Sequence, residues 1–139
     1  MKKTPVAKFR PPYSLHDMSV IAFEAEGNDI IMRTESGIMQ AVPPYAQHDG
    51  YVEFHGVRWE YSYALFLRHT SDMGVFTGEM HYMKEFVANF KNANFSVMDT
   101  TYCGDITKFS GFLSIGEDVI ECIIEIYHEG DMVFVDEEA

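Results

Sequence analysis

Basic residues are scarce in this sequence of 139 residues. Ten Lys and Arg stand against 22 Asp and Glu, which gives a formal net charge of −12. Four of the ten bases lie in the first twelve residues, so the chain from residue 13 onward carries 22 acids and six bases. Proteins bind nucleic acids mainly through basic side chains that displace counterions from the phosphates. We therefore expect no direct binding of nucleic acid.

Cysteine is scarce as well, because the chain contains only Cys103 and Cys122. Two cysteines without a second pair or a pair of histidines at ligand spacing do not form a zinc signature. In a reducing compartment cysteines stay unpaired. We expect both residues to be free and buried, and we predict no metal site.

Long apolar runs are absent too. The longest apolar stretches, at residues 61–67 and 123–126, are interrupted and fall far short of the roughly 20 residues that a membrane-spanning helix needs. At the N-terminus, Lys2 and Lys3 are followed by Thr4 and Pro5 instead of the apolar run of a secretory signal. We therefore expect a cytoplasmic protein with no membrane partner.

Motifs that mark nucleotide, cofactor or nucleophile sites are missing. The sequence has no GxGxxG, P-loop, GxSxG or HExxH pattern, and its ten glycines are spread through turn-like segments. His16, His48 and His128 each precede an acid, but neighbours on a strand point to opposite faces and rarely share one site. No cofactor and no catalytic residue is predicted, and enzymatic activity is disfavoured without being excluded.

What the chain does contain is enough apolar surface for one core. Hydrophobic residues make up 47% and aromatic residues 14% of the sequence, well above the composition of disordered chains. A length of 139 residues suits a single domain. Residues 1–13 are basic and contain Pro5, Pro11 and Pro12, which favours an extended lead-in. Residues 14–139 are predicted to form one α+β domain.

The alternation of apolar and polar residues predicts a fold dominated by antiparallel strands. Residues 18–26 and 30–34 flank a Gly-Asn-Asp turn, and residues 120–127 and 132–135 flank a Glu-Gly-Asp turn, so both pairs are typical of hairpins. One segment changes to helical spacing and predicts an amphipathic helix near residues 79–92. Its apolar face contains Met80, Met83, Phe86, Val87 and Phe90. We expect an α+β fold with a β-rich antiparallel sheet or partly closed barrel of about seven to nine strands.

The most regular alternation in the chain covers residues 57–68. One face of this predicted strand would carry Val57, Trp59, Tyr61, Tyr63, Leu65 and Leu67, and we expect this face to pack in the core. The opposite face, with Arg58, Glu60 and Arg68, would be mostly exposed to solvent. Base stacking by the aromatic residues is disfavoured by the acidic surroundings.

The last 23 residues are the most acidic part of the chain. They contain no Lys or Arg and nine acids, which are Glu117, Asp118, Glu121, Glu125, Glu129, Asp131, Asp136, Glu137 and Glu138. If Ile120, Cys122, Ile124 and Ile126 face the core, the opposite face presents Glu121, Ile123, Glu125 and Tyr127. This mixture of acid, Ile and Tyr is typical of an interface. We interpret these four residues as a surface that binds a basic protein.

The resulting hypothesis is a small cytoplasmic protein-binding module or inhibitor. In size and charge the chain resembles toxin-neutralising immunity proteins, although no motif carries that resemblance. Two alternatives stay open. One is a ligand-binding or enzymatic β-barrel whose pocket is lined by His48, His55, Trp59, Tyr61 and Tyr63, together with Phe66. The other is a structural domain without a separable activity. The sequence leaves homo-oligomers open.

Overall fold

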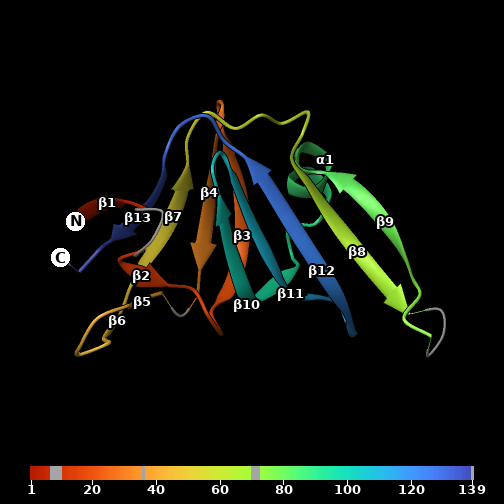
Figure 1. The fold of residues 1–139 in the computed structure, drawn as a ribbon, viewed down its shortest axis with the longest axis horizontal. Helices are drawn as coiled ribbons and strands as arrows, with labels where there is room; N and C mark the ends of the chain where they lie inside the picture. The colour runs from red at the N-terminus through yellow and green to blue at the C-terminus, as the bar shows by residue number, and fades with distance from the viewer. Residues whose placement is uncertain (7–10, 36, 70–72, 139) are drawn as a thin grey trace.

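The computed structural model describes residues 1–6, 11–35, 37–69 and 73–138 (Figure 1). These residues form thirteen strands and one short helix, so the predicted antiparallel α+β fold is confirmed. Ten strands make one sheet in which every neighbouring pair is antiparallel. The sheet is open, with β1 and β9 as its two edges.

The strands of the large sheet follow one another in an order that mixes early and late parts of the chain. From edge to edge they are β1 (Lys2–Pro5), β13 (Met132–Asp136), β7 (Gly50–Phe54), β4 (Asp29–Thr34), β3 (Ser19–Glu26), β10 (Asn94–Cys103), β11 (Ile106–Ile115), β12 (Asp118–Tyr127), β8 (Tyr63–His69) and β9 (Phe76–Tyr82). The predicted hairpins correspond to β3–β4 and to the β12–β13 region. However, β12 and β13 do not pair with each other, because β12 lies between β11 and β8.

A second, small sheet consists of β2 (Tyr13–Ser14), β5 (Ile38–Gln40) and β6 (Gln47–His48). It lies beside the β13 and β7 end of the large sheet (Figure 1). Of the predicted lead-in, Lys2–Pro5 also belong to this end of the molecule, since β1 pairs along β13 and the Lys3 Nζ lies 3.3 Å from the Glu53 carboxylate, whereas residues 7–10 lie outside the described residues. Lys2–Pro5 therefore form an edge strand of the domain.

Helix α1 (Met83–Asn89) is shorter than the predicted helix at 79–92. Residues 79–82 instead continue β9, where Met80 pairs with Leu65 and Tyr82 pairs with Tyr63. The predicted core side of the helix is confirmed for Met83 and Phe86, which are buried. The helix packs against β3, β8 and β9. In the described part of the chain, no helix is long and apolar enough to cross a membrane.

The core packs the inner side chains of the large sheet against α1 and against residues of the small sheet, such as Tyr13 and Ile38. Its largest fully buried side chains include Phe54, Phe95, Phe109 and Phe134, and the rings of Phe54 and Phe109 lie 6.1 Å apart in an edge-to-face arrangement. The hollow that Phe23, Phe86, Phe95 and Leu113 enclose measures only about 10 Å³. This volume is about that of one water probe, so this part of the interior holds no ligand cavity.

The prediction for residues 57–68 was wrong in two respects. Strand β8 begins at Tyr63, because residues 59–61 form a turn and Val57 makes only an isolated bridge with His128. The core face of β8 carries Ala64 and Phe66, whereas Leu65 and Leu67 lie on the opposite face. The register with β12 decides this orientation, since the buried Cys122 and Ile124 pair with Phe66 and Ala64. Apolar residues occupy both faces of the strand, so alternation alone could not identify the inner one.

Candidate interaction face

The four predicted partner-binding residues share one side of β12. Cys122, Ile124 and Ile126 are buried on the inner side of this strand. Because successive side chains of a strand point to opposite faces, Glu121, Ile123, Glu125 and Tyr127 lie together on the outer side. All four are half-buried between the neighbouring strands β11 and β8.

Residues of β11, β8 and β9 extend this surface sideways. Glu121 pairs with Phe112 and Leu67, Ile123 with Ser110 and Leu65, and Glu125 with Lys108 and Tyr63. We use the term outer face for the surface made by Tyr63, Leu65, Leu67, Met80, Tyr82, Phe112, Glu121, Ile123, Glu125 and Tyr127. Three of its large side chains are well exposed, namely Met80 (51%), Tyr82 (45%) and Phe112 (40%). Contiguous exposed apolar surface of this kind marks interaction sites.

A shallow groove crosses the outer face between β10, β11 and β12. It has a volume of about 260 Å³ and is lined by Leu67, Met98, Asp99, Ser110, Gly111, Phe112, Glu121, Cys122 and Ile123. Two features of the backbone lie beside it. Strand β10 bulges between Val97 and Asp99, and Gly111 has no side chain because a Cβ atom would collide with the Ser96 carbonyl oxygen.

The carboxylate of Glu125 is held in place on the outer face. The Tyr63 hydroxyl donates a hydrogen bond to Glu125 Oε2 at 2.7 Å. Burial, and to a smaller extent this hydrogen bond, raises the pKa of Tyr63 to about 12. The hydroxyl therefore stays protonated at neutral pH and orients the Glu125 carboxylate beside the apolar Ile123.

Aromatic residues gather at one end of the outer face. The rings of Tyr61 and Tyr127 lie 6.1 Å apart, and the Arg58 guanidinium lies 5.2 Å from the centre of the Tyr61 ring. Arg58 also donates to Glu60 Oε1 at 2.8 Å and pairs with Glu129, and both contacts raise its pKa. Tyr61 is 55% exposed, which is the reverse of the core position that the sequence predicted.

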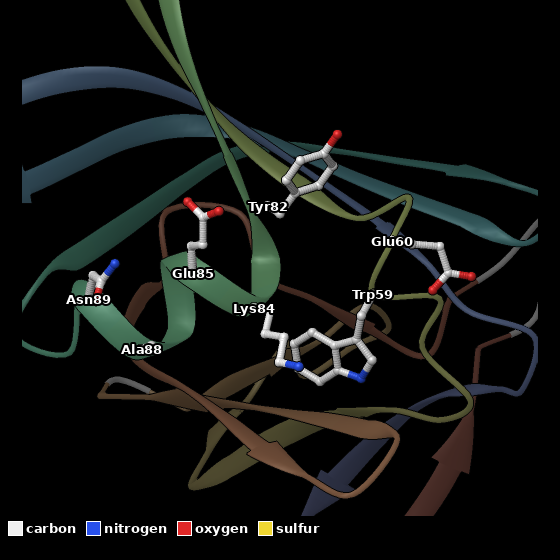
Figure 2. A pocket seen from close by; sticks show the side chains of 7 residues that line it. All are labelled: Trp59, Glu60, Tyr82, Lys84, Glu85, Ala88 and Asn89. Carbon is white, nitrogen blue, oxygen red and sulfur yellow. The ribbon is translucent and has the colours of Figure 1, made fainter.

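An open groove adjoins this aromatic end (Figure 2). We call it the Trp59 groove, and it measures about 790 Å³. Its lining consists of Trp59, Glu60, Tyr82, Lys84, Glu85, Ala88 and Asn89. The turn before β8 supplies Trp59 and Glu60, the end of β9 supplies Tyr82, and α1 supplies the other four residues. Tyr82 belongs both to this groove and to the outer face, so the two surfaces are continuous.

The five residues of the alternative pocket do not come together. Trp59 lines the Trp59 groove, and Tyr61 and Tyr63 contact Tyr127 and Glu125 at the outer face. His55 contacts the carboxylates of Asp29 and Glu53 at 3.1 and 3.3 Å. His48 lies on β6, at the end of the molecule opposite to α1 and β9 (Figure 1). These five residues therefore do not line one common pocket.

His48 instead belongs to a buried polar cluster that the sequence did not indicate. Its Nδ1 donates to Asp136 Oδ2 at 2.7 Å, and the Tyr13 hydroxyl donates to the same oxygen at 2.9 Å. Burial raises the pKa of Asp136, but the hydrogen bonds from His48, Tyr13 and the Glu138 amide outweigh it, so this pKa is lowered. The hydrogen bond to Asp136 raises the pKa of His48. The cluster joins the small sheet to β13.

His128 is also a structural residue. It is buried, and because a carbonyl oxygen can only accept, its Nδ1 donates to the Gly130 carbonyl at 2.8 Å. Its Nε2 then accepts from the Thr107 hydroxyl at 2.8 Å. Both ring nitrogens are therefore satisfied inside the protein, and neither is directed at a ligand.

The cysteines are both free, but only one is buried as predicted. Cys122 lies in the core, where burial raises its thiol pKa to about 12, whereas Cys103 is exposed at the end of β10. In the ranges that the structure describes, no three His, Cys, Asp or Glu residues are arranged to hold a metal ion. Comparison with known proteins found no family model, curated protein or solved structure that matches this chain.

Proposed function

We propose that this protein is a binding module that docks a basic protein on its outer face. The observation that carries the proposal is the exposed apolar surface of β8, β9, β11 and β12, with Glu121 and Glu125 set among its side chains. Interfaces combine an apolar and aromatic centre with a polar rim. The outer face has this composition, and its acids carry the charge that selects a basic partner.

The charge of the whole chain supports the same partner class. A net charge of −12 attracts basic proteins over a distance and accelerates their association, while it repels other acidic molecules. The acids Asp99, Glu121 and Glu125 lie on or beside the outer face with the base Lys108, and at its aromatic end Arg58 is paired with both Glu60 and Glu129. An inhibitor of a basic toxin or enzyme, which resembles immunity proteins in charge and size, is the most concrete form of the proposal. A cytoplasmic location is part of it, because Cys103 is exposed and free.

The ligand-binding alternative has less support. Its five candidate residues contact different partners on different elements, and the hollow inside the core measures only about 10 Å³. Ligand sites are usually cavities of about 300–1,000 Å³ that enclose most of their ligand. The Trp59 groove and a hollow of about 390 Å³ beside the end of α1 reach that size, but neither is enclosed, and the Trp59 groove adjoins the outer face.

Reversing the charge of the outer face should strongly weaken partner capture without unfolding the protein. The double variant Glu121→Lys with Glu125→Lys places two cations where a basic partner would dock. We expect capture from native cell extract to fall by about tenfold or more, because like charges facing one another across an interface cost several kcal/mol. The measurement is affinity capture followed by mass spectrometry, with circular dichroism to verify folding.

A matched control separates local docking from overall charge. The variant Glu26→Lys with Glu137→Lys changes the net charge by the same amount, but both residues are exposed outside the outer face. The proposal requires that this control still captures the partner at moderate salt. Equal capture by both double variants, or no captured protein with the wild type, would remove the docking face and leave a structural domain as the better interpretation.

A further inference from the structure

We infer that the Trp59 groove receives an arginine side chain of the basic partner. This inference rests on the proposed function and identifies the group that the acidic surface recognises. The groove joins the outer face through Tyr82, so a partner docked there lies next to it. Its volume of about 790 Å³ is ample for one long side chain and part of the backbone that carries it.

The aromatic lining favours a planar cation. Trp59 and Tyr82 stand on two sides of the groove and come from different elements (Figure 2). A guanidinium group stacks on aromatic faces, and Trp is the best ring for such cation–π contacts. Arginine and aromatic residues are also the side chains that contribute most to binding at protein interfaces. The lining therefore matches arginine better than an apolar or acidic side chain.

The carboxylates of the groove supply a counter-charge. Glu60 and Glu85 line it, and Lys84 is the single base among the lining residues. Glu60 already accepts a hydrogen bond from Arg58, which lies outside the lining. A backbone hydrogen bond and the hydrogen bond from Arg58 lower the pKa of Glu60, so the Glu60 carboxylate stays ionised. Glu85 is exposed in the first turn of α1, and its carboxylate is the one that the groove offers to an incoming guanidinium.

Lys84 is the group that such an arginine must displace. Its side chain extends toward Trp59 (Figure 2). Together these two residues also line a second hollow of about 260 Å³ with Ala25, Gly27, Asn28 and Val87. The ammonium group thus reduces the attraction of the groove for a second cation. Lys84 and Glu85 are neighbours on α1 but carry opposite charges. Replacing each of them with a neutral residue should therefore change the affinity for arginine in opposite directions.

Trp59 provides a direct signal because it is the only tryptophan in the chain. The probe is a capped Gly-Arg-Gly tripeptide, and the matched probe replaces arginine with citrulline, which has nearly the same shape and no charge. We expect a saturable change in Trp59 fluorescence with the arginine peptide and none with the citrulline peptide. Glu85→Gln should weaken arginine binding roughly two- to fivefold, and Lys84→Gln should strengthen it by a similar factor. Glu137→Gln, at the other end of the sheet, should change nothing.

The outcomes separate this inference from the proposed function. A response that is absent up to roughly 10 mM peptide, equal for arginine and citrulline, or unchanged in the Glu85 and Lys84 variants, would overturn the arginine site. If the outer-face charge reversal then still strongly weakens partner capture, the docking function stands without it. If the arginine response is found but charge reversal leaves capture intact, the groove binds arginine and the outer face is not the docking surface.

Discussion

Replacing Phe86 with alanine is expected to lower the free energy of unfolding by about 3–5 kcal/mol. Phe86 is 2% exposed, and its ring lies 5.6 Å from that of Phe23, 6.2 Å from that of Phe66 and 5.5 Å from that of Phe90. Helix α1 has only seven residues, too few to be stable by itself in water. Packing of Phe86 and Met83 therefore holds it in place. The measurement is the midpoint and slope of urea denaturation.

Phe112→Ala provides the matched control, since the same chemical change is made on the outer face. Phe112 is 40% exposed, and we expect a loss of about 1 kcal/mol or less. An unchanged denaturation midpoint for Phe86→Ala, or equal losses for both variants, would contradict the placement of α1 against the sheet. The Trp59 groove depends on the same placement, because α1 carries Lys84 and Glu85.

Replacing Asp136 with alanine should cost about 2–4 kcal/mol of stability. The carboxylate is 1% exposed and accepts hydrogen bonds from His48, Tyr13 and the Glu138 amide. Its removal leaves the Tyr13 hydroxyl without its acceptor in a buried position and disconnects the small sheet from β13. Asp136→Asn, which keeps an acceptor for Tyr13 but removes the charge beside His48, should lose less.

The difference in stability between the wild type and Asp136→Ala should depend on pH in a defined way. The pKa of His48 is raised, so its contribution is complete below about 6.5 and is lost as the pH rises through the raised value. The pKa of Asp136 is lowered, so its contribution is present above about 3.9 and is lost as the pH falls through the lowered value. Urea denaturation across this range should show the largest difference between about pH 4 and 6.5. A difference that does not vary with pH would contradict the His48–Asp136 pair.

Much of the fold follows from local patterns. The β3–β4 hairpin is recognisable because its turn residues and alternating arms agree, and Met83 and Phe86 have the spacing of a buried helix face. The pairing of β12 with β8 and of β1 with β13 depends on contacts between distant parts of the chain. Local alternation does not contain this information, which is why the inner face of β8 was assigned incorrectly.

The candidate site was predictable to a similar degree. Alternation in residues 120–127 correctly placed Glu121, Ile123, Glu125 and Tyr127 on one face, because the buried isoleucines leave only one orientation. Met80 and Tyr82 were missed because Met80 lies three residues before Met83, a spacing that also fits a helix, so the segment that contains both was assigned to the helix. In the structure, pairing with β8 makes this segment a strand. The Tyr13–His48–Asp136 cluster joins residues 123 positions apart at most, and no sequence pattern connects them.

Hydroxyl-radical footprinting of the protein bound to its captured partner tests the docking face most directly. Met80, Tyr82 and Phe112 are exposed on the outer face, whereas Val42 and Tyr45 are exposed in the loop after β5. Docking on the outer face predicts that oxidation of Met80, Tyr82 and Phe112 falls in the complex while that of Val42 and Tyr45 stays as in the unbound protein. Protection of Val42 and Tyr45, with the three outer-face residues unchanged, would contradict it.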